Sequence, residues 1–351
     1  MPLLNTLGTV PAKGFGYSLG GAGAGLFAFT SFTFTTANQN NTSTAHQGPS
    51  LSQCQSAYAG QPWLTSYFSM ITNGYQLWTV PSTGNYTIKV YGARAGTVNS
   101  TYTPGQGAII QGTVNLLSGT VLEIICGQYQ DPTYLGNISS YYGPGGGGGS
   151  FVSIPATSTL LFAAGGGGGP GFYSSGSPQG FSGGNGVTST SALGSGAGAG
   201  GTGASQNGAS LNNYIGGPGA GWFSNGAENT SESYRGYSGN SHSNGFTGGQ
   251  YTTTWGNPTT YASSYGGFGG AGGGDGLISG GTGGGYSGGG YGGSSTYTVQ
   301  TYGGASYIIS TATGVATSDG NYNGISTFGG SSITNLSAYN NGAGQVTITK
   351  N

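Results

Sequence analysis

Runs of glycine set the strongest limit on what this chain can fold into. Glycine supplies 81 of the 351 residues, and the densest stretch, residues 266–293, reads GGFGGAGGGDGLISGGTGGGYSGGGYGG. Glycine loses more conformational entropy on ordering than any other residue, so a chain this rich in it stays disordered unless something packs against it. Aromatic residues make up 12% of the chain, and apolar residues recur in alternating runs, so we expect an ordered structure with a buried core.

Short alternating segments predict an all-β fold. The clearest segment is YTIKVY at residues 86–91, in which Tyr86, Ile88 and Val90 alternate with polar residues. Further strands, each bounded by Gly, Ser or Pro, are predicted within residues 26–36, 107–114, 121–128, 150–154, 160–164, 296–310 and 344–350. Many short strands without helical periodicity are typical of a β-sandwich or jelly roll. Only residues 53–58 and 62–70 have any helical character.

The strands lie on both sides of the longest glycine-rich region, and this order predicts the domain organisation. We expect residues 1–74 to be an N-terminal attachment region with a β-strand and residues 75–350 to be a glycine-rich domain. Within that domain, strands in residues 75–164 and 296–350 flank an insertion of about residues 165–293. If the first and last strands share one sheet, the insertion is anchored at both ends and is no free linker.

A glycine-rich region of this kind can adopt three structures. Collagen needs Gly at every third position and abundant proline, whereas the spacing here is irregular and Pro totals 13, so collagen is excluded. A flexible linker is the second, but Trp222, Phe223 and Trp255 within the region favour order. The third, which we favour, is a bundle of extended polyglycine helices of polyproline-II type, with about three residues per turn, whose backbone groups pair between neighbours.

Several segments resemble the glycine-rich domain of the anaplastic lymphoma kinase and leukocyte tyrosine kinase receptors, which also occurs in viral and bacterial proteins. The matching pieces keep their order and approximate spacing over about residues 75–350: YGARAG (91–96), VLEIICGQ (121–128), GPGGGGGSFV (143–152), LLFAAGGGGG (160–169), GGFGGAGGG and GGGYSGGGYGG within 266–293, and GQVTITK (344–350). The resemblance implies a jelly roll similar to tumour necrosis factor, with polyglycine helices inserted between its strands. It does not imply receptor function, because the sequence contains no kinase domain, and the extra cysteines of the family are missing.

A second resemblance concerns phage proteins. The opening MPLLNTLGTVPAKGFG is similar to the start of phage tail and virion proteins, and the predicted bundle is similar to the tip adhesins of T-even-like phages, in which loops that link glycine helices contact the host. By this analogy the receptor-binding candidates are the aromatic-rich loop residues Trp222, Phe223, Tyr234, Arg235, Tyr237, Tyr251 and Trp255. Flat rings offer a large contact area at small entropic cost, which suits a glycan or protein surface. The alternative for each tyrosine is that it merely coats the bundle.

Charge and hydropathy exclude several classes of partner. Only 3% of the residues are charged, against about 25% in ordinary globular domains. Five Lys and Arg without a cluster cannot hold nucleic acid or an anionic membrane surface. No run approaches the roughly 20 apolar residues of a membrane helix, and the N-terminus lacks the pattern of a secretory signal. We expect a virion surface or other extracellular location, reached by release of assembled particles.

The acidic residues and histidines do not predict a catalytic, metal or cofactor site. Glu228 and Glu232 are the only close acidic pair. A glycosidase-like pair is conceivable, but a solvated polar loop is the simpler interpretation. His46 and His242 lie far apart in Ser- and Asn-rich contexts, so we expect both to face solvent. No glycine run has the strand–loop–helix context and GK[ST] ending of a nucleotide-binding loop.

Two further features stay open at this level. Cys54 and Cys126 match no metal-binding spacing, and they are expected to be two buried free thiols or a disulfide pair. Glu123 lies in a predicted strand, and we expect it to point outward or to pair with Lys89 or Arg94.

We therefore expect a non-enzymatic virion surface or tail-fibre protein that displays aromatic loops to bind a host-surface glycan or protein. Contacts with other virion proteins would use the N-terminal region, and a homo-oligomer, a trimer by analogy, would suit both the jelly roll and a fibre. The alternatives are a purely architectural capsid, tail or fibre-shaft subunit, and a secreted matrix or ligand-binding module.

Overall fold

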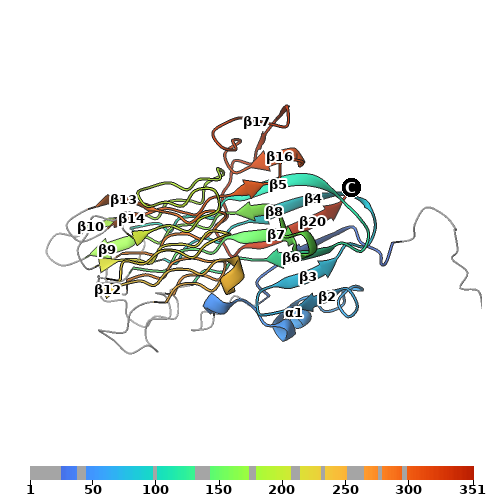
Figure 1. Ribbon diagram of the computed structural model, residues 1–351, viewed down its shortest axis with the longest axis horizontal. Helices are drawn as coiled ribbons and strands as arrows, with labels where there is room; N and C mark the ends of the chain where they lie inside the picture. The colour runs from blue at the N-terminus through green and yellow to red at the C-terminus, as the bar shows by residue number, and fades with distance from the viewer. Residues whose placement is uncertain are drawn as a thin grey trace, which may run out of the picture.

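Strands dominate the part of the chain that the structure describes. The computed structural model describes residues 25–37, 45–97, 101–130, 143–173, 179–206, 214–230, 234–250, 265–275, 279–294 and 299–351. Within these ranges strands far outnumber helical turns, and most strand pairs are antiparallel, which confirms the predicted all-β class. Figure 1 shows two regions along the long axis: broad strands at one end and narrow extended segments at the other.

Two six-stranded sheets form the first region. Sheet A has the order β1 (Ser31–Phe34), β20 (Gln345–Lys350), β4 (Gly84–Tyr91), β5 (Ile109–Leu116), β16 (Thr313–Thr317) and β19 (Thr334–Asn335). Sheet B has the order β15 (Tyr307–Ile308), β8 (Thr159–Ala164), β7 (Ser150–Ile154), β6 (Val121–Ile125), β3 (Gln76–Thr79) and β2 (Phe68–Met70). All neighbours are antiparallel except the short pair β16–β19.

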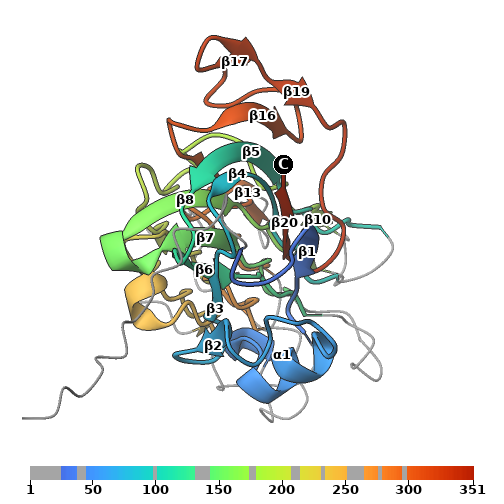
Figure 2. The ribbon, with the colours of Figure 1, turned by 90° about the vertical axis from the view of Figure 1, so that its right-hand side faces the viewer.

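The two sheets pack face to face as a sandwich around one apolar core (Figure 2). From β4, Ile88 and Val90 point into this core, and from β6 of the opposite sheet Leu122 and Ile124 meet them. The core positions in β4 are those that the sequence alternation marked as inward-facing. Each fully buried side chain of this size contributes about 1.5–3 kcal/mol.

The N-terminal residues join both sheets. β1 pairs with β20 at the edge of sheet A, and β2 pairs with β3 at the edge of sheet B, so the predicted boundary at residue 75 falls between two paired strands. The strand predicted over residues 26–36 is shorter than expected and begins at Ser31. Of the two segments with helical character, residues 53–58 overlap helix α1 (Leu51–Ala57), which begins with a capping box formed by Ser50 and Gln53. Residues 62–70 form turns and strand β2 instead of a helix.

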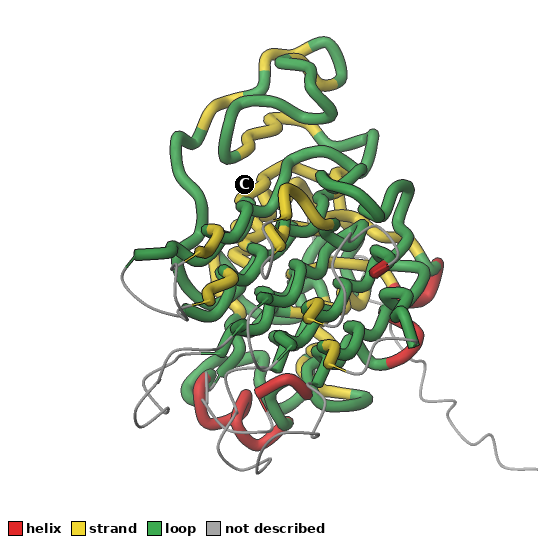
Figure 3. The backbone as a smooth tube through the Cα atoms, turned by 90° about the vertical axis from the view of Figure 1, so that its left-hand side faces the viewer, coloured by secondary structure: helices red, strands yellow, loops and turns green. Residues whose placement is uncertain are grey.

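The second region consists of three excursions from the strands of the sandwich. Residues 92–108 join β4 to β5, residues 126–149 join β6 to β7, and residues 165–306 join β8 to β15. The described parts of all three run side by side as extended segments, seen nearly end-on in Figure 3, and we call this region the glycine bundle. The predicted insertion of about residues 165–293 lies within the longest excursion.

Short elements complete the described part of the chain. They are the paired strands β9 (Gly171–Tyr173) and β10 (Gln179–Phe181), β11 (Tyr214–Ile215) and β12 (Tyr234–Arg235), β13 (Tyr291–Ser294) and β14 (Val299–Thr301), β17 (Thr327–Phe328) and β18 (Ser331–Ser332), and the 3-10 turns η1 (Ala45–Gln47), η3 (Pro155–Thr157) and η5 (His242–Asn244).

Backbone hydrogen bonds between segments repeat every three residues. The amides of Gly166 and Gly169 donate to the carbonyls of Gly284 and Gly281, while the two glycines between them donate to two other segments. The same three-residue step recurs in three other pairs of segments, where the first residue's amide donates to the second residue's carbonyl: 146 to 272 and 149 to 269; 217 to 273 and 220 to 270; 184 to 301 and 187 to 304. Successive residues of one segment therefore bond to different neighbours.

These positions are glycine because a side chain would collide with the backbone of a neighbouring segment. A Cβ atom at Gly284 would overlap the carbonyl oxygen of Gly269, and one at Gly166 would overlap that of Gly147. Neither Gly284 nor Gly166 has a positive φ. Lack of space, rather than an unusual backbone conformation, therefore requires glycine here, and the close approach lets buried amides and carbonyls pair directly.

Replacing Gly284 with alanine is expected to lower the free energy of unfolding by about 3 kcal/mol or more, because the added methyl group overpacks a site bounded by backbone. Gly84→Ala is the matched control, because a Cβ there meets only the flexible Lys350 side chain at 3.7 Å. Thermal and urea denaturation of both variants measure the difference. Equal melting of Gly284→Ala and the unchanged protein would contradict this account of the bundle.

Buried thiols and a buried phenol make the core sensitive to alkali. Cys54 and Cys126 are both buried and both free in the structure. Burial raises the pKa of Cys54 from its ordinary value of 9.0 to about 12 and also raises the pKa of Cys126. Burial likewise raises the pKa of Tyr322 from 10.0 to about 12. The folded protein therefore holds these protons at pH values where the unfolded chain releases them.

Because these pKa values are raised on folding, their stabilising effect is complete below pH 9 and is lost as the pH rises toward 12. Between its unfolded and its folded pKa, each group lowers the free energy of unfolding by up to about 1.4 kcal/mol per pH unit. Urea denaturation over a pH series spanning the window tests this expectation. Cys54→Ala should reduce the slope of the free energy of unfolding against pH just above pH 9. An unchanged slope in that variant would show that the Cys54 thiol is not the group responsible.

Candidate functional site

The structure separates the predicted binding residues into two surfaces. Trp222 and Phe223 lie at a cleft beside the edge of sheet B, whereas Tyr237 lines a groove on the glycine bundle and Arg235 lies next to it. Outside the described residues lie the side chain of Tyr234 and all of Tyr251 and Trp255.

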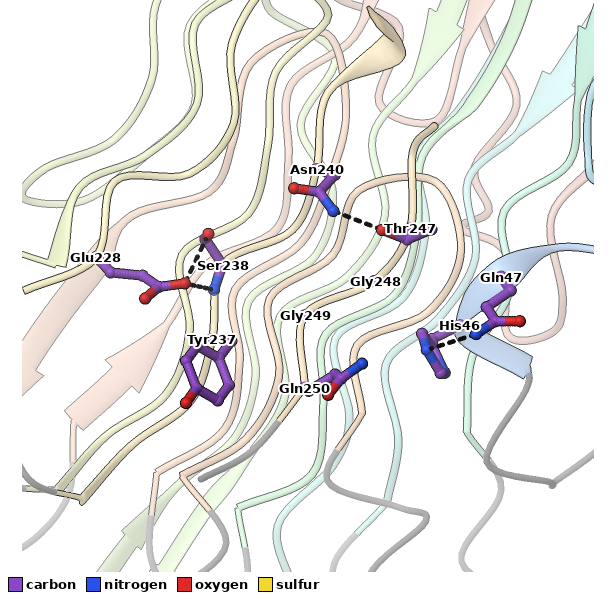
Figure 4. A pocket seen from close by; sticks show the side chains of 10 residues that line it. All are labelled: His46, Gln47, Glu228, Tyr237, Ser238, Asn240, Thr247, Gly248, Gly249 and Gln250. Atoms are coloured by element: carbon purple, nitrogen blue, oxygen red, sulfur yellow. Dashed lines mark hydrogen bonds between the residues drawn. The ribbon is translucent and has the colours of Figure 1, made fainter. Parts of the chain in front are cut away.

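A polar groove of about 430 Å³ lies on the flank of the bundle (Figure 4). It is lined by His46, Gln47, Glu228, Tyr237, Ser238, Asn240, Thr247, Gly248, Gly249 and Gln250. The floor at Gly248 and Gly249 is bare backbone. Both amides of the floor are already used, since that of Gly248 donates to the His46 carbonyl at 2.9 Å and that of Gly249 to the Ala271 carbonyl at 2.8 Å.

The charged groups at the polar groove are held by one another and by the backbone. Glu228 Oε1 accepts hydrogen bonds from the amide and the hydroxyl of Ser238, at 2.9 and 3.0 Å. Its Oε2 lies 3.6 Å from Nε of Arg235, whose guanidinium lies 5.6 Å from the centre of the Tyr237 ring. A partly exposed pair of this kind contributes at most about 1 kcal/mol to stability, so its main effect is to order the groove wall. Glu232, the other member of the close acidic pair, lies outside the described residues.

The second surface is an aromatic cleft of about 320 Å³, lined by Ser158, Thr159, Leu160, Trp222, Phe223, Tyr286 and Tyr307. Phe223 is 65% exposed, while Trp222 is only 8% exposed. The ring centre of Tyr286 lies 6.4 Å from that of Phe223 and 4.8 Å from that of Tyr307. Of the two adjacent predicted residues, Phe223 is therefore the ring that a partner can reach.

Trp222 covers an interaction that the sequence analysis missed. Nε2 of His242 lies 2.7 Å from Oε1 of Glu123, which also accepts a hydrogen bond from Ser153 Oγ at 3.0 Å. The Trp222 indole stacks on the His242 imidazole, with ring centres 4.1 Å apart and planes 19° apart. Tyr75 donates its hydroxyl proton to the carbonyl of His242 at 2.6 Å.

Three expectations from the sequence are wrong here. Glu123 lies on the outer face of sheet B but is only 4% exposed, and it pairs with His242 rather than with Lys89 or Arg94. His242 does not simply face solvent, because its ring is half-buried between Trp222 and Glu123. His46 is buried as well, and its ring stacks on Tyr265 at 4.7 Å.

The reason is that the outer face of sheet B does not meet solvent. Ile125 and Phe151 on this face form a second apolar cluster with Phe246 and Phe268 of the glycine bundle. A strand covered on both faces reads as a nearly continuous apolar run, and VLEIIC at residues 121–126 has that pattern. This run was the available signal that Glu123 would be buried.

Replacing His242 with alanine is expected to lower the free energy of unfolding by about 3 kcal/mol, because the buried Glu123 carboxylate loses its partner. Glu123→Gln should lower it less, since the neutral amide needs no counter-charge. The double variant should lose less stability than the sum of the losses in the two single variants, with a difference of about 1 kcal/mol or more. Urea denaturation of the four proteins tests this, and strictly additive losses would show that the two side chains are not coupled.

Other site types are not seen in the described ranges. There, three or more His, Cys, Asp or Glu side chains do not converge as they do around a metal ion. None of the helices in the described part of the chain has the length and apolar content of a membrane span.

Comparison with known proteins leaves the assignment to the geometry. No protein-family model matches this chain, and no curated protein is significantly similar to it.

Proposed function

We propose that this chain is a non-enzymatic virion surface protein, of tail or fibre type, that binds a host-surface glycan or protein through exposed aromatic side chains. The observation that carries the proposal is the 65% exposure of Phe223 in a cleft that also contains Tyr286. A large ring held in the open by a firm support offers contact area at low entropic cost. Polar side chains at the polar groove add hydrogen-bonding capacity.

The support is proposed to be a bundle of polyglycine helices attached to a jelly roll similar to tumour necrosis factor. The three-residue step of the hydrogen bonds supports the first part, because a helix with about three residues per turn presents every third amide to the same neighbour. Two antiparallel sheets packed face to face support the second part. The two together would form a stiff projection.

The two ends of the molecule suit different contacts. Leu26 and Leu117 are 46% and 64% exposed. Both lie by the turn between β3 and β4, since the Leu26 amide donates to the Pro81 carbonyl and that of Gly119 to the Val80 carbonyl. This end of the sandwich lies away from the bundle (Figure 1). We propose that it attaches, with the N-terminal region, to other virion proteins in a homo-oligomeric assembly, while the bundle projects toward the host.

The exposed apolar residues at the sandwich end also favour a second candidate. In this candidate, the protein is an architectural capsid, tail or shaft subunit without a receptor contact. The exposed aromatic side chains would then be dispensable for adsorption, and assembly would depend on Leu26 and Leu117.

Phe223→Ala in particles that carry the protein is expected to reduce adsorption to host cells about tenfold, with particle yield unchanged. Trp222→Ala is a poorer test, because that indole is buried against His242. The matched control is Ile325→Ala, which removes a residue of similar exposure (54%) that does not line the cleft. Adsorption of Phe223→Ala particles at the unchanged rate would favour the architectural candidate. Loss of particles in Leu117→Ala is expected from both candidates and does not separate them.

A further inference from the structure

The polar groove has hydrogen-bonding capacity that the described residues do not use. The hydroxyl of Tyr237, the amide of Gln250 and the side-chain carbonyl of Gln47 have no hydrogen-bond partner among these residues. Asn240 uses Nδ2 to donate to Thr247 at 2.6 Å, and its Oδ1 is left available. The groove wall therefore offers a hydroxyl and three amide groups, which together donate and accept.

Tyr237 adds an apolar contact beside these groups. Its side chain is 37% exposed, and the Arg235 guanidinium lies over the ring. The Tyr237 amide donates to the Gln250 carbonyl at 2.6 Å, so the two residues are neighbours in the lining of the groove (Figure 4). The C–H groups on one face of a sugar ring carry slight positive charge, and they pack well on the negative face of an aromatic ring.

The charges around the groove argue against an ionic ligand. Glu228 carries the only carboxylate among the lining residues, and Ser238 and Arg235 already engage it. An anionic ligand would meet this carboxylate with no lysine or arginine lining the groove to offset it, and a cationic ligand would have to displace its present partners. His46, the histidine of the lining, is buried and stacked on Tyr265.

The size of the groove suits a small ligand. Gly248 and Gly249 contribute only backbone to its lining. The volume of about 430 Å³ falls within the roughly 300–1,000 Å³ that is usual for small-ligand sites. That space holds a short oligosaccharide rather than a folded partner.

From these features we propose that the polar groove binds a neutral oligosaccharide, with one sugar ring packed on Tyr237 and its hydroxyl groups bonded to Gln250, Asn240 and Gln47. This inference rests on the proposed function, since it names the glycan class that the bundle would recognise on a host surface. The site is separate from the aromatic cleft around Phe223.

The experiment measures binding of the full-length protein to a panel of neutral di- to tetrasaccharides of hexose and N-acetylhexosamine units, with sialylated and phosphorylated counterparts. At least one neutral member should bind with a Kd of about 1 mM or tighter, and its charged counterpart should bind more weakly. Tyr237→Ala and Gln250→Ala should each weaken binding about tenfold or more, and Tyr237→Phe should retain most of it. Phe223→Ala, in the other surface, should bind as the unchanged protein does.

Thermal melting of each variant shows whether it is folded; Tyr237 and Gln250 are exposed, so their loss should leave melting unchanged. The inference is overturned if no neutral member binds, if only charged members bind, or if both alanine variants bind normally. Its failure is distinguishable from failure of the proposed function. If adsorption depends on Phe223 but no glycan binds, only the inference is removed. If a glycan binds but particles adsorb to host cells without this protein, only the proposed function is removed.

Discussion

Backbone amides and carbonyls of neighbouring glycine-rich segments bond directly to one another, with no side chain between them. Each amide that enters the interior of the bundle must find a carbonyl, and the three-residue step in the hydrogen bonds allows one segment to satisfy several neighbours in turn. A single Cβ at Gly284 or Gly166 would overlap a carbonyl oxygen. The positions of the exposed rings depend on this contact, because the amides of Phe223 and Tyr237 donate to the carbonyls of Gly201 and Gln250 in neighbouring segments.

The bundle and the sandwich are one structure because they share strands and a second core. β4, β6 and β8 continue directly into bundle segments, and the outer face of sheet B is covered by Phe246 and Phe268. The Glu123–His242 pair lies at this junction, with Trp222 stacked over the imidazole. Removing His242 would leave the buried Glu123 carboxylate with the Ser153 hydroxyl as its hydrogen-bond donor among the described residues. The pair therefore ties the loop around His242 to the sheet.

The two proposed contact surfaces follow from the composition of the chain. With 3% charged residues, attraction over long distances is weak, and binding has to rely on rings, hydroxyls and amides at short range. The aromatic cleft supplies rings around Phe223, and the polar groove supplies amides beside Tyr237. Both kinds of side chain need a support that holds them without covering them, and a backbone-bonded bundle provides it.

The sequence by itself determined the strand class, the inward positions of β4, the closing strand β20 and the need for close backbone contact at the glycine runs. Those features are local, because alternation and missing Cβ atoms act within a few residues. Only the tertiary structure decided that the described parts of residues 92–108 and 126–149 join the bundle, that Glu123 meets His242 across 119 residues, and that Phe223 is exposed while Trp222 is covered. Any glycine segment can bond to any other, so the local pattern does not say which segments become neighbours, and that choice sets which side chains face solvent.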